Sequence, residues 1–477
     1  MYPFLIQHIF LAFFFADLFA LWEKKKVADI GVGNFGGDSV AWTGWGVFPS
    51  EEEMPNEFPI SVKKAIPNYY EETKKLLNFV KVGEGEERNE LYDVLHSELF
   101  NFLQNNIEKV PSLKKVKEAY ISRSPENKYK KLCVVKPFLQ LIQQNQERID
   151  LITECKVEKI ILDENDTPTA LQTSKGNILV NFAKIIISGN NFNSLELVLN
   201  SFKKQIPNAG KRYSAHLLQQ LVVRIPRSQF PFADLLHPLE LSQFHIYGEN
   251  HFSSQRIGKF HIQFRAISDS EFQQIRNHPE VPNAFYRTSK YFTSNHFILF
   301  NLTSLGEIDY KNPLNFCEVN LTRGDKDSPG SSVPTTSVPL PASSVPLPAS
   351  EEMLTNSLLL HCHSSEFEQD LITKIHESSV EIFKTIFMQK NTEYYSVQDN
   401  QWKEEPSPPI LHGVSVHPCS SLWMGESPDS IVDENYKLRG VNHVYVTGTC
   451  LWPSSASLNP TALIVAMALH LVDSLIF

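Results

Sequence analysis

The sequence predicts an α/β fold in two parts: a three-layer α/β unit and an α+β domain built on an antiparallel sheet. Three observations lead to this prediction. The apolar run at 184–188 ends at a glycine and precedes a helical pattern over 193–202, which is the order of a strand, a turn and a helix. Residues 218–310 are extended and rich in aromatic side chains, as in an antiparallel sheet. Residues 444–477 read as a buried strand, a loop and a long apolar helix.

The size and charge of the chain narrow the class of protein. The chain has 477 residues, with 44 Lys or Arg and 54 Asp or Glu, so its formal net charge is −10. At about 150 residues per domain, this length corresponds to two or three domains. The acidic balance argues against a nucleic-acid binder, because phosphates require a positive face. The 6 cysteines are scattered without CxxC spacing and do not indicate a disulfide scaffold.

Residues 1–26 form an apolar N-terminal segment that three interpretations fit. Residues 2–22 have the length of a membrane span, which is about 20 apolar residues. Gln7, His8 and Asp17 interrupt the run, and such groups are costly inside a membrane. A secretory signal would begin with a basic residue, which this segment lacks. We expect a membrane anchor, a weak signal sequence or a buried helix. Membrane contact would occur through residues 2–22, and the localisation stays undecided.

Helical and strand patterns alternate between this segment and the sheet. Apolar residues recur at helical spacing in three stretches, and they alternate or form short runs in three others. We expect helices over 60–80, 89–109 and 135–145, and strands over 150–163, 170–180 and 184–188.

Residues 327–350 interrupt the second half of the chain. They are rich in Pro and Ser and contain SVPLPAS twice in tandem, at 337–343 and 344–350. Because prolines remove backbone donors and this composition cannot form a core, we expect a flexible surface insertion. An amphipathic helix is expected to follow at 364–389.

The C-terminal region carries the most specific pattern. His417 lies in a polar loop, and Gly440 marks a turn before the apolar strand 444–446. Asn459-Pro460-Thr461 then opens the last helix, with Asn459 where an N-cap belongs and Pro460 suited to the first turn. The start of such a helix offers free N–H groups and a positive dipole end to an electron-rich oxygen or an anion.

This arrangement resembles the glucose–methanol–choline (GMC) family of flavin oxidoreductases, and within it the pyranose-oxidase-like branch. The family pattern is a His, a small-residue loop with Met-Gly, Val-Asp, a Gly turn with a strand, a Pro loop and Asn-Pro-Thr. The matching residues are His417, Met424-Gly425, Val432-Asp433, Gly440, Val444 to Val446, Pro453 and Asn459-Pro460-Thr461. The resemblance extends over residues 30–477 and is weakest between 218 and 400.

The resemblance implies a Rossmann-like site for FAD, assembled from segments far apart in the sequence. Gly36-Gly37, Ser39 and Trp42 are similar to the family's loop over the flavin. Val157 would pass the adenine, and Gly189 is similar to the family's Ala-Gly turn. The residues implied for cofactor binding are Gly36, Gly37, Ser39, Trp42, Val157, Gly189, Gly448, Pro460 and Thr461. A further element, Gly210-Lys211-Arg212-Tyr213 with His216, resembles the family's Gly-Arg-Tyr…His.

The sequence also departs from the family in three places. Residues 31–36 spell GxGxxG but are followed by more Gly and Pro instead of a helix, so we interpret them as a decoy. We therefore expect the family's first βαβ unit, which holds the ADP half of FAD, to be lacking. Ala41 stands where pyranose oxidases carry the histidine linked to flavin, so non-covalent FAD is expected. Trp423 replaces the Arg before Met-Gly, which leaves the shape of that loop in question.

The implied chemistry is oxidation of the CH–OH group of an alcohol or a sugar, with hydride transfer to flavin N5. Histidine suits a base near neutral pH, because its unperturbed pKa is about 6.5. By position, His417 would be the base and Asn459 would hold the substrate oxygen, while the backbone at Pro460 and Thr461 would stabilise charge in the reduced flavin. The alternative is a degenerate, non-catalytic remnant that acts as a binding protein.

The resemblance also implies that the domains are discontinuous. The FAD-binding domain would combine residues 27–50, 130–215 and 410–477, and the substrate domain with its cap would combine 51–129 and 216–409. The expected partner is a small alcohol or sugar, and the electron acceptor is undecided. We do not expect a metal at His361-Cys362-His363 and His376, because no acidic partner is evident for them.

Overall fold

The structure of the chain is a computed structural model that describes ten stretches of the sequence. These are residues 10–13, 42, 44–84, 91–126, 131–181, 183–253, 256–270, 296–319, 358–409 and 415–476. Several predicted features lie outside the described residues: Gly36, Gly37, Ser39, Ala41, the run 31–36, the insertion 327–350 and most of residues 2–22.

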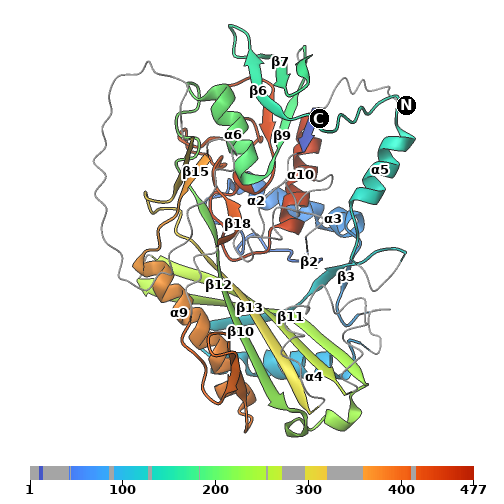
Figure 1. The fold of residues 1–477 in the computed structure, drawn as a ribbon, viewed down its shortest axis with the longest axis vertical. Coiled ribbons are helices and arrows are strands. Elements are labelled where there is room, and N and C mark those ends of the chain that lie inside the picture. The colour runs from blue at the N-terminus through green and yellow to red at the C-terminus, as the bar shows by residue number, and fades with distance from the viewer. Residues whose placement is uncertain are drawn as a thin grey trace.

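An antiparallel sheet of eight strands fills the lower part of the molecule in Figure 1. Its order is β17-β16-β10-β13-β12-β11-β4, and β18 pairs with the start of β10. The strands are β4 (Leu113–Glu118), β10 (Ser214–Pro226), β11 (Leu239–Ser253), β12 (Arg256–Asp269), β13 (Phe297–Glu307), β16 (Glu393–Ser396), β17 (Gln401–Lys403) and β18 (Ser415–Cys419). This sheet confirms the mixed fold and the extended structure predicted within 218–310.

The two faces of this sheet differ, because successive residues of a strand point to opposite faces. On β12, Phe260 and Phe264 belong to an apolar face. That face is covered by α4 (Val94–Asn106), α9 (Glu366–Glu381) and the π-helix η7 (Ile382–Phe387). The intervening residues His261, Gln263 and Arg265 form part of the opposite, polar face. The candidate site is built on this polar face.

A second sheet consists of three parallel strands in the order β1-β9-β19. The strands are β1 (Phe10–Phe13), β9 (Ile185–Ser188) and β19 (Val444–Val446). Helix α6 (Asn190–Phe202) follows β9 directly and packs against the meander of β6 (Val157–Leu162), β7 (Pro168–Thr173) and β8 (Gly176–Leu179), as Figure 1 shows. Ligands of such parallel sheets bind at the carboxyl ends of the strands.

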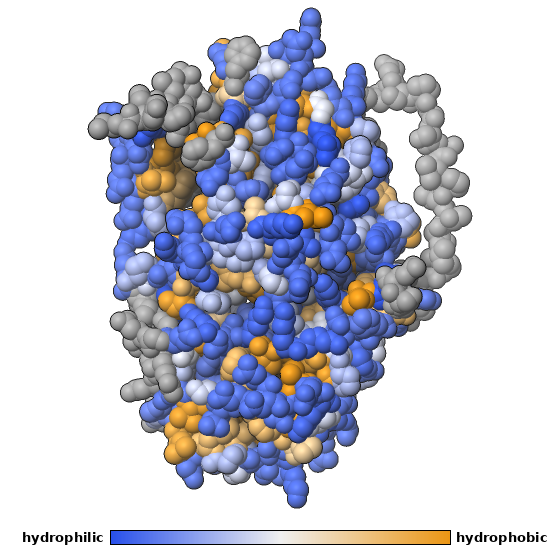
Figure 2. Space-filling view, turned by 180° about the vertical axis from the view of Figure 1, so that it is seen from behind, coloured by the Kyte–Doolittle hydropathy of each residue, from blue (hydrophilic) through white to orange (hydrophobic). Residues whose placement is uncertain are grey.

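Four residues of the apolar N-terminal segment form strand β1, which pairs with β9 from Phe10 opposite Ile185 to Phe13 opposite Ser188. These four residues are extended and therefore do not form the buried helix that was one of the three interpretations. The other two interpretations concern residues that lie mostly outside the described stretches. A continuous apolar run suits a strand of a parallel sheet equally well, which explains the difference. Within the described stretches, no helix is long and apolar enough to cross a membrane. On the face shown in Figure 2, hydrophilic residues predominate and hydrophobic ones gather in separate patches.

Most other elements match the predicted ranges. The stretch 60–80 contains α2 (Ile60–Ala65), the 3₁₀ helix η1 (Ile66–Tyr69) and α3 (Tyr70–Leu76), while α5 (Val135–Gln144) and α10 (Thr461–Ile476) lie where helices were expected. The strand predicted at 150–163 begins only at Val157, because Glu154 has a φ of +52°, outside the range of regular extended backbone. The short elements are β2 (Trp45–Gly46), β3 (Phe79–Lys81), β5 (Tyr120–Ser122), β14 (Phe316–Val319), β15 (Leu358–His361) and the 3₁₀ helices η3 (Ile107–Lys109), η4 (Arg227–Gln229), η5 (Ala233–Leu235) and η8 (Thr449–Leu451).

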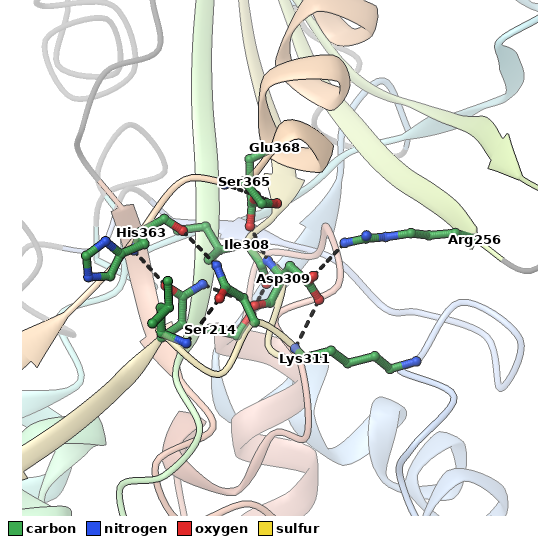
Figure 3. A network of polar contacts seen from close by, with 11 residues as sticks. Ser214, Arg256, Ile308, Asp309, Lys311, His363, Ser365 and Glu368 are labelled. Atoms are coloured by element: carbon green, nitrogen blue, oxygen red, sulfur yellow. Dashed lines mark hydrogen bonds and ion pairs between the residues drawn. The ribbon is translucent and has the colours of Figure 1, made fainter. Parts of the chain in front are cut away.

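A network of polar contacts joins the start of α9 to the sheet (Figure 3). Ser365 caps α9, and Glu368 of its first turn accepts a hydrogen bond from the backbone N–H of Asp309 at 2.8 Å. Asp309 in turn forms an ion pair with Arg256 at 2.5 Å. One residue before it, the carbonyl O of Ile308 accepts from Ser214 Oγ at 2.7 Å. The network therefore fixes the start of β10, where the candidate site begins.

Candidate active site

His417 lies in a β-bulge. The pairing of β18 with β10 shifts register between Ser214 and His216, where β18 contains one residue more than β10. His417 has a φ of +58°, in the left-handed region that residues other than glycine seldom adopt. A bulge turns a side chain away from the regular pleat. Backbone in a sparsely populated conformation is also common at functional sites.

The hydrogen bonds of His417 fix the position of its ring proton. Nε2 of His216 lies 2.9 Å from the carbonyl O of Ser455, which can only accept, so Nε2 carries the hydrogen. Burial lowers the pKa of His216 well below its ordinary value, so the ring is neutral and its Nδ1 is an acceptor. Nδ1 of His417 lies 2.9 Å from that atom and must donate. Nε2 of His417 therefore has a lone pair and can act as a base.

His417 is also neutral near physiological pH. Withdrawal of the ring from water, with a contribution from nearby His261, lowers the pKa of His417 to about 4. This value lies below the 6.5 on which the sequence-based choice of a base rested, so His417 is a weaker base than an ordinary histidine. The residue as a whole remains partly exposed, whereas His216 is fully buried. The unprotonated nitrogen thus belongs to the partly exposed residue of the pair, while the ring that accepts from His417 is buried.

Asn459 is oriented by a second set of hydrogen bonds. Arg265 Nη2 donates to Gln263 Oε1 at 3.0 Å, and a guanidinium can only donate. The amide nitrogen of Gln263 is thereby directed at Asn459, whose Oδ1 accepts from Gln263 Nε2 at 2.7 Å. Asn459 Nδ2 is left as a donor on a side chain that is partly exposed. Within the described ranges no N–H of α10 bonds to this side chain, so the predicted N-cap bond is not formed.

The loop before Asn459 is fixed to the sheet by its own polar groups. Ser455 Oγ donates to the carbonyl O of Ala215 at 2.7 Å. The N–H of Ala456 donates to Glu307 Oε1 at 3.1 Å, and Ala456 has a φ of +47°. Burial of the carboxyl group raises the pKa of Glu307 to about 7. Because this loop also accepts from His216, it ties His417 and Asn459 to one rigid element.

A second pair of histidines repeats the arrangement of the first. His261 Nδ1 lies 2.7 Å from the carbonyl O of Ser457, so that nitrogen carries the hydrogen. His261 Nε2 then accepts from His245 Nδ1 at 2.7 Å. His245 Nε2 is left with a lone pair. That atom is buried, and although the backbone of Gly46 acts on the pKa of the ring, no group among the described residues forms a hydrogen bond of acceptable geometry with Nε2.

The carboxyl ends of β9 and β19 carry further polar atoms without partners. Thr447 follows β19, and its N–H donates to the carbonyl O of Ile187 at 2.9 Å. Thr447 Oγ1 and the Nδ2 of Asn191, in the first turn of α6, are buried and have no partner among the described residues. Gly448 has a φ of +108°, and a Cβ built there would meet no atom within 4 Å. This edge of the sheet therefore has the open backbone and the spare hydrogen-bonding capacity of a ligand site.

Trp423 contacts an arginine from another segment. The guanidinium carbon of Arg212 lies 3.8 Å from the Trp423 ring centroid and 4.8 Å from that of Tyr310. Nη1 of the same arginine donates to the carbonyl O of Pro453 at 3.4 Å. A guanidinium thus adjoins this loop, although it comes from a different part of the chain.

The predicted site residues fall into two groups. His417 and Asn459 are joined through the loop 452–460 and the polar face of the sheet, and Pro460 and Thr461 start α10 beside them. Gly189 precedes α6 at the end of β9, and Gly448 follows β19. Val157 begins β6, and Trp42 donates from Nε1 to the carbonyl O of Trp45. Nothing in the described residues joins Val157 or Trp42 to His417.

Four residues of the site were not singled out from the sequence: His261, Gln263, Arg265 and His245. The available signal was the spacing of 261, 263 and 265, since residues two apart in a strand share a face.

No metal site is evident in the described ranges, which contain no group of three or more His, Cys, Asp or Glu side chains that could hold an ion. His361 instead contacts Glu318 at 3.0 Å.

Comparison with known proteins gives one family match. Residues 357–468, which include His417 and Asn459, match the family model of the GMC oxidoreductase C-terminal domain. Among solved structures, pyridoxine 4-oxidase from Mesorbium loti is similar, with 14% sequence identity, a TM-score of 0.44, and coverage of 79% of this chain and 70% of that chain. No curated protein matches the chain.

Proposed function

We propose that the chain is an FAD-dependent oxidoreductase that acts on the CH–OH group of an alcohol or a sugar. The observation that carries the proposal is the hydrogen-bond chain from Ser455 through His216 to His417, which leaves Nε2 of His417 as a base. The family match over residues 357–468 supports the assignment, because both proposed catalytic residues lie inside the matched segment.

The described residues fit non-covalently bound FAD at the carboxyl edge of the parallel sheet. Thr447 Oγ1 and Asn191 Nδ2 are buried and unpartnered there, and Gly448 leaves backbone open to a ligand. Gly189 and the starts of α6 and α10 would add N–H groups and positive dipole ends. FAD bound at this edge would supply the hydride acceptor for alcohol oxidation. Residues 27–50, 130–215 and 410–477 are the proposed FAD-binding domain, and 51–129 and 216–409 the substrate domain.

The proposed roles of the protein side chains follow from their orientation. His417 Nε2 would take the proton of the substrate hydroxyl, because it is the unprotonated nitrogen on the partly exposed residue of the pair. Asn459 Nδ2 would donate to the substrate oxygen, because its Oδ1 is occupied by Gln263. A donor fixed beside a base stabilises the charge that develops on that oxygen as its proton leaves.

The test is a visible absorbance spectrum of the purified chain before and after addition of FAD. We expect the shifted flavin spectrum of a bound cofactor, which a set of simple alcohols and sugars bleaches in the absence of oxygen. His251→Gln, at an exposed position near the end of β11, is the control variant and should behave like the wild type. A protein that stays colourless after FAD is added would contradict the proposal and favour a non-catalytic binding protein.

A further inference from the structure

Buried polar atoms without partners gather around Trp45 on the polar face of the large sheet. They are Gln243 Oε1, His245 Nε2 and Arg265 Nε. The ring of Trp45 lies 4.9 Å from the ring of His245, and its centroid is 4.5 Å from the guanidinium carbon of Arg265. Gln243 lies opposite Arg265 in the pairing of β11 with β12. The cluster thus joins neighbouring positions on two strands and one aromatic ring.

Arg265 is the unusual member of this cluster. The residue is only 7% exposed, and within the described stretches of the chain no carboxylate lies in ion-pair range of its guanidinium. A buried charge without a counter-charge is costly, and proteins normally pair it. Burial lowers the pKa of Arg265 to about 10, so the guanidinium still carries its charge at neutral pH. An anionic ligand group would supply the missing counter-charge.

The other two atoms require a different partner. Gln243 Nε2 donates to the hydroxyl of Tyr92 at 2.5 Å, which directs Oε1 away from it as an acceptor. His245 Nε2 is also an acceptor, because Nδ1 of the same ring donates to His261. Acceptors are satisfied by donors such as hydroxyl groups, not by a carboxylate. The cluster therefore combines one cation with two acceptors.

This cluster is connected to the proposed reaction site. Arg265 donates to Gln263, and Gln263 donates to Asn459. Gln263 and Arg265 are two residues apart on one strand, so their Cα atoms are separated by about 7 Å. One Gln side chain therefore bridges Asn459 and Arg265, and a single ligand that reaches both would carry its reacting hydroxyl at Asn459 and its charged group at Arg265.

We propose that the cluster of Gln243, His245 and Arg265 binds a polyhydroxylated carboxylic acid, with the carboxylate on Arg265 and hydroxyl groups on Gln243 and His245. The inference rests on the proposed function, because it defines the substrate class of that site. Arg265 is thereby a specificity-determining residue, and through Gln263 it also positions Asn459.

The test is calorimetric titration of the purified full chain with D-glucuronate and with D-glucose, which differ in the carboxylate, at equal ionic strength. We expect the wild type to bind D-glucuronate at least about 10-fold more tightly, since a hydrogen bond to a charged group contributes about 10- to 100-fold. Arg265→Met should abolish this preference, and Arg265→Lys should retain part of it. Arg224→Met is the matched control, because Arg224 already pairs with Glu393 at 2.7 Å, and it should bind like the wild type.

Equal affinity for the two probes in the wild type, no binding of either, or a preference that survives Arg265→Met would each overturn the inference. If Arg265→Met fails to fold by circular dichroism, Gln243→Leu provides the second variant and should weaken binding of both probes. The titration requires neither FAD nor turnover. A protein that oxidises alcohols without preferring the acid contradicts only this inference, whereas one that prefers the acid but ignores FAD contradicts only the proposed function.

Discussion

The two histidine pairs share one arrangement and differ at the end that carries the lone pair. In each pair, a buried ring donates to a carbonyl of the loop 452–460 and accepts from a second ring, at 2.9 Å in the first pair and 2.7 Å in the other. The first pair ends at His417, which is partly exposed and lies in a bulge. The second ends at His245, which is only 2% exposed and lies in regular strand β11.

This difference shows that the hydrogen-bond chain alone does not define a catalytic base. Both chains prepare an unprotonated nitrogen, but a base must also reach the proton that it removes. His417 is a partly exposed residue in a bulge, whereas His245 stays among buried neighbours in a regular strand. The comparison favours the proposed roles, which are proton transfer for the first pair and ligand binding for the second.

The largest effect is expected when the lone-pair residue of each pair is replaced. His417→Gln should lower the rate of flavin reduction by alcohol about 10³-fold, because a positioned general base contributes about 10²- to 10⁴-fold. His245→Gln should instead weaken substrate binding and leave that rate within a few-fold. Stopped-flow absorbance without oxygen measures both rates. Equal losses in the two variants would remove the distinction between the pairs.

A smaller effect is expected at Asn459, the donor that works with the first pair. Asn459→Ala should lower the rate of flavin reduction about 10²-fold, since loss of one preorganised donor costs about 10²- to 10³-fold. Asn459→Asp should not restore the rate, because a carboxylate offers no N–H group. The same measurement on Ser474→Ala, at the end of α10, provides a control. A fully active Asn459→Ala variant would contradict the orientation derived from Gln263.

A modest effect is expected at His216, which positions His417 without touching substrate. His216→Phe removes the acceptor for His417 Nδ1 and should lower kcat/KM about 10-fold, because a misoriented base loses part of its contribution. His216→Asn keeps an acceptor oxygen and should recover much of the rate. If both variants lose activity equally, His216 has only a packing role. Steady-state kinetics with thermal unfolding as the folding control separate these outcomes.

The pH dependence of stability should reveal both pairs together. Burial lowers the pKa values of His261 and His417 to about 4, and it also lowers those of His216 and His245 well below the ordinary value. The unfolded chain therefore binds more protons below pH 6.5, so this stability is fully present above about pH 6.5 and is lost as the pH falls toward 4. Each histidine contributes a slope of up to about 1.4 kcal/mol per pH unit. Glu307 has the opposite shift and reduces the slope between its ordinary value of 4.5 and about 7.

Urea unfolding at several pH values between 4 and 8 measures this slope. His245→Gln removes one of the titrating groups and should reduce it. A free energy of unfolding that does not change between pH 5 and 7 would contradict the neutral, buried state of these rings.

The sequence predicted the elements of the fold better than the contacts of the site. His417 and Asn459 could be proposed as site residues because they lie in short motifs with a family resemblance. Apolar periodicity located α6, α10 and the large sheet. The supporting residues could not be found this way. Gln263 and Asn459 are 196 positions apart in the sequence, and they form a hydrogen bond only because the fold places β12 next to the loop 452–460.

The same limit explains the features that were missed. The bulge at His417 depends on the pairing of β18 with β10, which no local pattern encodes. The sequence showed that a Trp stands at position 423 where the resemblance implies an Arg. It did not show that the guanidinium of Arg212, from another segment, lies against the Trp423 ring.

The most direct test of the central claim is the tautomer of His417 in the purified chain. Two-bond ¹H–¹⁵N correlation spectra of histidine-labelled protein at pH 7, assigned with His417→Gln, report which ring nitrogen is protonated. The structure predicts a neutral ring with the hydrogen on Nδ1 and a lone pair on Nε2. A ring protonated on Nε2, or a doubly protonated ring, would contradict the assignment of His417 as the base.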